Sequence, residues 1–445
     1  MIHWEGWLAV AVLIVFLLFL PESHAACQGL SPLEETMAEY LNETEEEAIA
    51  FLERVVNINS GTMNHEGVRE VGRIFREELD ALGFETRWVD LPPEADRAGQ
   101  LFGKRAGNGT GPKILMIGHI DTVFEEDSPF QRFRRVGDMA YGPGVIDMKS
   151  GDVAILYALK ALAHAGVLDD LQVVVALTGE EESPGRPLSV SRRDLIEAGQ
   201  WSDLALGFES GRRTDGVEYA TVARRSSTGW LLEVEGTMGH SSRIFSQEYG
   251  AGAINEAARI LHDFYDEVRG EELLTFNAGL ILGGTELGFD EAEKRGSAAG
   301  KTNVISQTAL VRGDIRTISG EQLERTRERM REVVAQHLPG TSATITFTDG
   351  YPAMTPEPEN YALLRRLSRV NQDLGNGPME PLDPGARGAA DISFVAPHTP
   401  ALSGMGPYGS GAHSPDEALE LGSLKLSAVR AAILMHRIAV EGVRP

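Results

Sequence analysis

The sequence predicts an α/β protein, in which a mostly parallel sheet flanked by helices is interrupted by an inserted α+β domain. From about residue 66 to 210, short apolar runs alternate with amphipathic stretches, and strands separated by helices form parallel sheets covered on both faces. From about 217 to 350 the strands become longer and alternate apolar with polar residues. The last part, 351–445, is too short and loop-rich to be a domain alone, so we expect it to complete the first domain.

The elements of the first part follow from apolar spacing. A period of three to four residues predicts a helix, and a short β-branched run predicts a buried strand. We therefore expect helices at 49–56, 68–79 and 153–162, and strands at 114–117, 171–177 and 204–208. The acidic lead-in at 28–48 is interpreted as a charged helix face or a flexible stalk.

The middle part and the end of the chain differ from the first part in their pattern of apolar and polar residues. We expect strands at 230–234, 273–282 and 309–317, and helices at 251–268 and 322–337. After a proline-rich joint come a helix at 360–370, a glycine-rich loop segment at 374–412 and a closing helix at 421–438. The predicted domains are thus a first domain in two parts, 28–216 and 351–445, around an inserted domain at 217–350.

Charge and cysteine content exclude some classes of function and stabilisation. The 445-residue chain carries 66 acidic and 41 basic residues, a net charge of −25, and a surface of that sign repels nucleic acid phosphates. We expect no nucleic acid partner. Cys27 is the one cysteine, so no internal disulfide can form and the fold depends on its core or on bound metal.

Residues 1–27 resemble a targeting segment. The apolar run Trp7–Leu20 is shorter than the roughly 20 residues that span a bilayer, and small residues precede Cys27, as at a signal-peptide cleavage site. No Lys or Arg occurs before Arg54, so the usual positive start is missing. We expect a periplasmic or secreted protein; an uncleaved N-terminal anchor is the main alternative, and lipidation of Cys27 is a lesser one.

Side chains that can bind a metal follow the predicted strands. His119 and Asp121 come directly after the strand at 114–117, at the edge where open α/β sheets bind ligands. A neutral imidazole binds divalent metals, and a nearby carboxylate fixes its tautomer. A His-x-Asp alone is more often an ordinary polar turn at the end of a strand, so other motifs must support it.

Further carboxylates gather at similar places. Asp147 ends a stiff glycine- and proline-containing turn, just before a helix that we expect to begin near Ser150; a capping role is the alternative. Glu180–Glu182 directly follow an apolar strand, where three adjacent carboxylates repel one another unless cations neutralise them. Glu209 ends the next strand in the same way.

His413 completes this set of side chains. It lies in a glycine- and serine-rich segment that can approach a site closely. With His119, Asp147, one Glu of the triplet and Glu209, it gives two imidazoles and three carboxylates, which suit two zinc ions that share a carboxylate. One glutamate is left over, and a carboxylate beside a metal-bound water is what a hydrolase needs as its general base.

Together these motifs resemble a di-zinc metallopeptidase and deacylase family. Its members include carboxypeptidase G, acetylornithine deacetylase, succinyl-diaminopimelate desuccinylase and the aminoacylases, and the pattern is closest to carboxypeptidase G-like glutamate carboxypeptidases. The resemblance rests on His119-x-Asp121, Gly144-Val-Ile-Asp147-Met-Lys-Ser-Gly, the Glu triplet, Glu209 and Ala412-His413-Ser, in order within about residues 45–440. It implies a zinc-exopeptidase-like catalytic domain, an inserted lid and dimerisation domain, and a homodimer.

The resemblance also implies roles for these residues. Two zinc ions, for which cobalt or manganese could substitute, would share five ligands: a bridging Asp147, His119 and Glu209 on one ion, and Glu182 and His413 on the other. Asp121 would orient His119, and Glu181 would be the general base. The family's usual order is Asp-Glu-Glu, and Glu180 in the Asp position leaves the register of Glu181 and Glu182 open by one residue.

Three residues of the inserted domain resemble the family's substrate contacts. His240 in Thr237-Met-Gly-His-Ser would polarise the scissile carbonyl, often across a dimer; Asn303 and Arg316 would hold the substrate carboxylate. The alternatives are a loop histidine with local partners and an exposed strand cation. The segment 385–391, GARGAAD, resembles a further substrate loop, in which no residue is assigned a role.

The function implied is that of a zinc-dependent hydrolase which cleaves an amide or peptide bond next to a free carboxylate. Its substrate would be a small peptide or an N-acyl amino acid. A carboxypeptidase is the first interpretation, and an N-acyl-amino-acid deacylase of the same family is the second. The alternative of another class is a non-catalytic exported binding protein. Contact with a membrane is expected only through the N-terminal segment.

Overall fold

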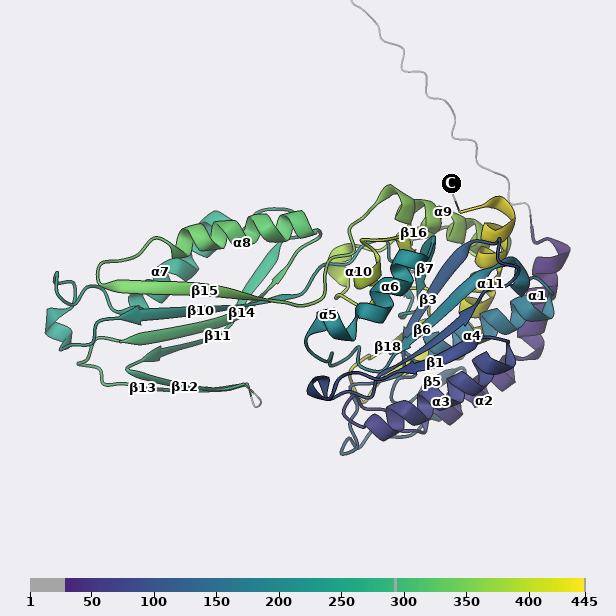
Figure 1. Ribbon diagram of the computed structural model, residues 1–445, viewed down its shortest axis with the longest axis horizontal. Helices are drawn as coiled ribbons and strands as arrows, with labels where there is room; N and C mark the ends of the chain where they lie inside the picture. The colour runs from purple at the N-terminus through teal and green to yellow at the C-terminus, as the bar shows by residue number, and fades with distance from the viewer. Residues whose placement is uncertain (1–28, 292–293, 444–445) are drawn as a thin grey trace, which may run out of the picture.

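The computed structural model describes residues 29–291 and 294–443, and Figure 1 shows two bodies arranged along the long axis of the molecule. The predicted targeting segment, 1–27, lies outside the described residues. Within those two ranges, none of the helices combines the length and the apolar character needed to cross a membrane.

The larger body is built on a six-stranded mixed sheet in the order β1-β2-β6-β3-β7-β17. Its strands are β1 (Glu85–Val89), β2 (Gln100–Arg105), β3 (Lys113–His119), β6 (Gln172–Thr178), β7 (Leu204–Gly207) and β17 (Ala401–Leu402). From β6 to β17 all neighbours run parallel, whereas β2 is antiparallel to both of its neighbours. This confirms the predicted α/β fold with a mostly parallel sheet.

Helices cover both faces of this sheet. One face carries α3 (His65–Ala81), α4 (Lys149–His164), α9 (Pro358–Asp373) and α11 (Leu421–Glu441), with α1 (Pro32–Glu43) and α2 (Glu45–Val56) packed against α4 and α11. The other face carries α6 (Arg193–Trp201) and α10 (Ile392–Val395). Strand side chains alternate between the two cores, because successive residues of a strand point to opposite faces: Met116 contacts the first core, and Leu115 and Ile117 contact the second.

Two smaller sheets extend the larger body. One has the order β18 (Gly409–Ser410), β19 (Ala418–Glu420), β5 (Met139–Tyr141), β4 (Arg134–Val136), and the other β16 (Met379–Pro381), β9 (Val217–Ala220), β8 (Arg212–Thr214). The glycine-rich segment is therefore not loop alone. Since β9 pairs with β16, it belongs to the larger body, and the inserted part begins later than the predicted boundary at 217.

The smaller body is an antiparallel sheet in the order β11-β14-β10-β15, covered on one face by two helices (Figure 1). Its elements are β10 (Thr228–Gly236), α7 (Ala253–Asp263) with a π-helical turn η4 (Phe264–Val268), β11 (Thr275–Gly284), β14 (Thr308–Arg316), α8 (Gly320–Val334) and β15 (Thr341–Asp349). Trp230, Val311, Phe264 and Met330 form the centre of a separate core. A hairpin of β12 (Glu286–Asp290) and β13 (Arg295–Ala299) lies beside β11.

The connections contain short helical turns. They are η1 (Pro93–Ala95), η2 (Leu168–Asp170), α5 (Leu188–Ser191), η3 (Ser241–Arg243) and η5 (Pro384–Ala386). The acidic lead-in is helical and packed rather than flexible. Glu34 forms a capping box with Ser31 and is 4% exposed, and its Oε1 lies 2.6 Å from Nε of Arg437 in α11.

Candidate metal centre

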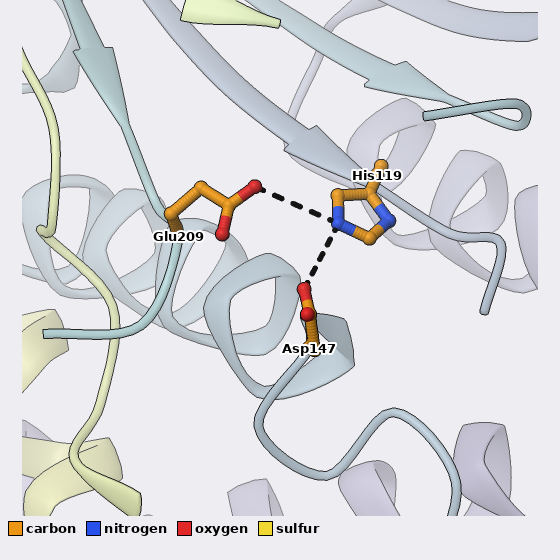
Figure 2. A group of neighbouring side chains, drawn as sticks. All are labelled: His119, Asp147 and Glu209. Atoms are coloured by element: carbon orange, nitrogen blue, oxygen red, sulfur yellow. Dashed lines mark ion pairs between the residues drawn. The ribbon is translucent and has the colours of Figure 1, made fainter. Parts of the chain in front are cut away.

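The first group of ligand atoms surrounds His119, the last residue of β3. Its Nε2 lies 3.3 Å from Oδ1 of Asp147 and 3.7 Å from Oε1 of Glu209, as Figure 2 shows. On the other side of the ring, Nδ1 lies 3.1 Å from the backbone oxygen of Asp121 and 3.4 Å from its Oδ1. Burial opposes a charge on this ring, but Asp121 and Asp147 outweigh burial and raise the pKa of His119 well above its ordinary value. A metal that binds at Nε2 therefore replaces a proton there, while the acceptors at Nδ1 hold the other proton and fix the ring.

Asp121 connects this histidine to the glutamate triplet. Its buried carboxylate accepts the N–H groups of Glu181 and Glu182, at 3.0 and 3.1 Å, and the hydroxyl of Thr62 at 2.6 Å. Burial opposes its charge, but His119 and these donors outweigh burial and hold the pKa of Asp121 below its ordinary value. One carboxylate therefore fixes both the ring of His119 and the backbone of the triplet.

The second group surrounds His413. Its Nε2 lies 3.1 Å from Oδ2 of Asp147 and 3.2 Å from Oε2 of Glu182. Asp147 is thus shared: one oxygen faces His119 and the other faces His413. Within each group the ligand atoms lie within 4.8 Å of one another. The two histidines hold the pKa of Asp147 below its ordinary value, although burial acts in the opposite direction.

A strand pair explains how Asp147 and His413 meet from distant parts of the chain. β5 leads into the turn before Asp147, and β19 follows the loop that carries His413; Tyr141 pairs with Ala418 in this sheet. Oε1 of Glu417 accepts the N–H groups of Ile146 at 2.9 Å and Asp147 at 3.1 Å. Asp147 therefore follows a strand of the small sheet, and its carboxylate meets His119 at the end of β3, at the edge of the main sheet.

Glu209 reaches the centre because α4 approaches the end of β7 closely. A Cβ atom on Gly151 would lie 2.1 Å from the carbonyl oxygen of Phe208, so only glycine permits this approach. The predicted helix near Ser150 begins at Lys149, one residue past the end of the turn. The N-terminal end of α4 is thereby placed between the segments that carry Asp147 and Glu209.

The three glutamates of the triplet have different surroundings. Glu180 is fully buried and forms an ion pair with Arg192, and its other oxygen accepts the N–H of Gly185 at 2.8 Å. Glu182 faces His413 and Asp147. Glu181 belongs to neither ligand group; burial and the nearby carboxylates of Glu209 and Asp391 raise its pKa well above the ordinary value.

The joint between the two bodies touches the backbone of Glu181. The hydroxyl of Tyr351, just after β15, donates to the carbonyl of Glu181 at 2.9 Å, and Nη2 of Arg192 donates to that hydroxyl at 2.9 Å. Arg192 is itself buried and held by Glu180 and Asp391. Neither Tyr351 nor Arg192 lies in a recognisable motif, so the sequence alone does not reveal them.

The structure does not bring the three predicted substrate contacts beside the ligand groups. His240 is exposed, and its Nδ1 lies 2.8 Å from Oγ of Ser242; Asn303 accepts the N–H of Ser241 at 2.9 Å. Arg316, at the end of β14, pairs with Asp314 at 2.8 Å. In strand register Thr228 is opposite Ile315 and Glu235 is opposite Thr308, so Arg316 and His240 lie at opposite ends of the small sheet.

The donor set fits two divalent cations. Imidazole nitrogens and carboxylate oxygens are the ligands that zinc takes in catalytic sites. Within the described residues, Nε2 of His119 is buried without a hydrogen-bond partner, as expected of an atom that faces a metal. Asp147 and Glu182 raise the pKa of His413 to about 11, so a cation that binds there replaces a proton.

The comparison with known protein families agrees with this geometry. A model of peptidase family M20/M25/M40 matches residues 115–437, which is well over half of the chain. The chain belongs to this family. It is accordingly a hydrolytic enzyme, and the resemblance inferred from the motifs is confirmed.

Curated relatives and solved structures show which known proteins this M20 protein is similar to. It is 27% identical to carboxypeptidase G2 of Pseudomonas sp. (strain RS-16), over 82% of this chain and 83% of that one. It is 26% identical to succinyl-diaminopimelate desuccinylase of Acidiphilium cryptum, over 86% and 96% of the two chains. Aminopeptidase PepT of Bacillus cereus shares the fold with a TM-score of 0.72 at 16% identity, covering 89% of this chain and 99% of that one.

A structure that is described as a dinuclear metal-binding peptidase of family M20 also shares the fold. This YXEP protein of Bacillus subtilis superposes with a TM-score of 0.60 at 16% identity, covering 90% of this chain and 99% of that one. The M20 enzyme described here therefore combines a family fold with two groups of metal-ligand side chains that share one aspartate.

Proposed function

We propose that this M20 enzyme is a zinc-dependent hydrolase of carboxypeptidase type, which cleaves an amide or peptide bond next to a free carboxylate. The observation that carries the proposal is the position of Asp147 between two ligand groups, with Glu181 left over beside them. Similarity to carboxypeptidase G2 over most of both chains supports the choice of reaction.

The roles of the protein's own residues follow from their contacts. Two zinc ions held by these ligands would lower the pKa of a water molecule and polarise the substrate carbonyl. Glu181 would take the proton from the attacking water and pass it to the leaving nitrogen, and its raised pKa suits a group that both accepts and donates a proton. Asp121 would keep the ring of His119 and the backbone of Glu181 in fixed positions.

Two substitutions of equal size test the division of roles in the triplet. In Glu181→Gln we expect a fall in kcat of about 10²- to 10⁴-fold, the usual contribution of a general base, with two metal ions per chain retained. In Glu182→Gln we expect loss of one of the two metal ions, because its carboxylate faces His413. Metal analysis and hydrolysis of dipeptides and N-acyl amino acids are the measurements. Undiminished hydrolysis by Glu181→Gln contradicts the assignment.

A deacylase of N-acyl amino acids is the second candidate function. Similarity to succinyl-diaminopimelate desuccinylase, over 96% of that relative, favours it. The ligand geometry serves both reactions, since each hydrolyses an amide. A panel of dipeptides and N-acyl amino acids, compared by kcat/KM, separates the two.

We also propose that the enzyme is exported, because of the apolar run Trp7–Leu20. The intact mass of the exported protein tests this proposal.

A further inference from the structure

Arg387 is a cation next to the first ligand group that the mechanism above does not use. It lies in the loop between η5 and α10 and is partly buried. Its Nη1 donates to Oγ of Ser210 at 3.1 Å, and its Nη2 donates to the carbonyl of the same residue. Ser210 directly follows Glu209, so the guanidinium is anchored one residue from a proposed metal ligand.

Two adjacent arginines donate hydrogen bonds to the backbone of the loop that carries Arg387. Nη1 of Arg224, a buried residue, donates to the carbonyl of Gly388 at 3.0 Å. Nη2 of Arg225 donates to the carbonyl of Gly385 at 3.4 Å, while its Nη1 contacts Oγ1 of Thr275 in the small body. The guanidinium of Arg387 is therefore presented by a braced loop and not by a freely moving side chain.

The charge of Arg387 is not neutralised by a direct partner. Among the residues that the structure describes, it forms no ion pair with a carboxylate; both of its hydrogen bonds go to Ser210, which is uncharged. By contrast, Arg316 is already paired with Asp314 at 2.8 Å. Burial and the neighbouring Arg224 lower the pKa of Arg387 to about 10, against the opposing effect of Glu209 and Asp147, so it remains positively charged at neutral pH.

The charges around Arg387 indicate that its guanidinium is available to bind an anionic group. Glu209 and Asp147 are the ligand carboxylates whose charge acts on Arg387. Two divalent cations held by the ligand groups would neutralise these carboxylates and leave the charge of Arg387 unopposed. A guanidinium at low water exposure binds a carboxylate through paired, charge-assisted hydrogen bonds, and low exposure strengthens that attraction.

From this arrangement we infer that Arg387 binds a carboxylate of the substrate and is a determinant of specificity for acidic substrates. The inference rests on the proposed function, which requires a free carboxylate next to the scissile bond. Two carboxylates have the right chemistry: the α-carboxylate of the released amino acid, or a side-chain carboxylate of the same residue. The experiment below separates them.

The test compares three substrates that differ by one charge. They are N-acetyl-glutamate, N-acetyl-glutamine, which lacks the side-chain carboxylate, and N-acetyl-isoglutamine, which lacks the α-carboxylate. In Arg387→Gln we expect kcat/KM for N-acetyl-glutamate to fall roughly 10- to 100-fold, the range for one charge-assisted pair, mainly through KM. For the analogue that lacks the carboxylate bound by Arg387, kcat/KM should not change on substitution. The analogue that behaves in this way therefore shows which of the two carboxylates Arg387 binds.

Two further variants control for fold and for long-range charge. Arg387→Lys keeps the charge but loses the paired geometry, so we expect a smaller loss on N-acetyl-glutamate. Arg212→Gln removes an exposed positive charge in neighbouring β8, and we expect kcat/KM to change less than about twofold, as for other exposed charges. Metal content and melting temperature show that each variant is folded and loaded.

A binding measurement decides the inference independently of turnover. In the Glu181→Gln background, we expect the Kd for N-acetyl-glutamate to rise roughly 10- to 100-fold when Arg387→Gln is added. Equal losses on all three ligands, or no loss on any, overturn the inference. If the wild type binds these ligands with the predicted dependence on Arg387 but hydrolyses none, the proposed function fails and the inference stands.

Discussion

At the scale of single residues, Glu417 shows how a side chain that binds no metal can place one that does. It is fully buried, and one of its oxygens accepts the backbone N–H groups of Ile146 and Asp147. Its Oε2 has no hydrogen-bond partner among the described residues, and burial raises the pKa of Glu417 to about 7. The position of the shared aspartate therefore depends on an acceptor from the C-terminal end of the chain.

A pair of substitutions at Glu417 separates this positioning role from a general loss of stability. Glu417→Ala leaves two buried N–H groups unpaired, and we expect metal affinity to fall about 10- to 100-fold, as for other residues that orient ligands. Glu417→Gln keeps an acceptor oxygen of the same size, so most of the affinity should return. Metal titration of the two variants is the measurement. Wild-type metal affinity in Glu417→Ala would mean that the turn before Asp147 holds itself.

The residue types of the centre could be predicted from sequence, but their supporting contacts could not. His119, Asp147, Glu209 and His413 each end a recognisable element or lie in a distinctive loop. The hydrogen bond from Asp147 to Glu417 spans 270 positions, and no local pattern reports which distant acceptor a buried N–H will find. The same holds for Thr62 and for the hydroxyl of Tyr351.

At the scale of elements, α1 shows that charge alone is a poor guide to exposure. Its glutamates suggested a solvated lead-in, yet Glu34 closes a capping box and contacts Arg437 of α11. These contacts, against the effect of burial, hold the pKa of Glu34 below its ordinary value. An ionised group with a lowered pKa stabilises the fold above the pKa of the unfolded chain, near 4.5, and this stabilisation is lost as the pH falls through the folded value.

Glu34→Gln should reveal this dependence on pH. At pH 7 we expect the variant to unfold with about 2 kcal/mol less free energy than the wild type, the usual value for a hydrogen bond between charged partners. Below the folded pKa of Glu34 the difference should shrink towards zero, since the wild-type carboxyl is then protonated. Urea unfolding at both pH values measures it, with exposed Glu35→Gln of the same helix as the control. A difference that does not change with pH would show that the Arg437 pair contributes nothing.

Among the strands, those with continuous or regularly alternating apolar residues were predicted, whereas the threonine-rich β15 was missed. β6 contains Val173, Val174 and Val175 and is buried on both faces, so its pattern is unmistakable. β15 places Thr residues between Ala343, Ile345 and Phe347, because only one of its faces packs against α8. Three apolar residues on one face of an edge strand are a weak signal beside the glycines and threonines around them.

At the scale of the whole molecule, the two ends of the small sheet have different surroundings. The end with Thr228 and Arg316 adjoins the joint, where Tyr351 contacts both Ser227 and Glu181. His240 follows the other end of β10, and a strand of nine residues spans roughly 25 Å. Rotation of the smaller body about the joint does not shorten the distance between His240 and the joint. We therefore expect that a His240 that acts on substrate comes from a second copy of the chain.

Mixing of two inactive variants tests this expectation. His240→Ala lacks the histidine and Glu181→Gln lacks the base, so each should be inactive alone. In a hybrid dimer, one centre has an intact Glu181 and faces an intact His240, and random pairing gives about a quarter of wild-type activity. Activity after co-incubation, with molecular mass from light scattering, is the measurement. A mixture no more active than its separate components shows that His240 does not act across subunits.

The inserted organisation was predicted at this scale because the change from short buried strands to long alternating ones is visible in composition. The boundary was placed too early because β9 has the texture of the inserted strands while it pairs with β16, far along the chain. Similarly, the motifs alone did not show that His240 and Arg316 lie at opposite ends of the small sheet, since register between strands is a tertiary property.

The pairing of β5 with β19 also has a consequence for biosynthesis. A polypeptide emerges from the ribosome with its N-terminus first, and early segments begin to fold before late ones exist. β3, β5 and α4 are made long before β19, so a growing chain has Asp147 without Glu417 to hold its backbone and without His413 to share its carboxylate. The second ligand group can therefore form only after residues 413–417 have been made, and a chain terminated before them lacks it.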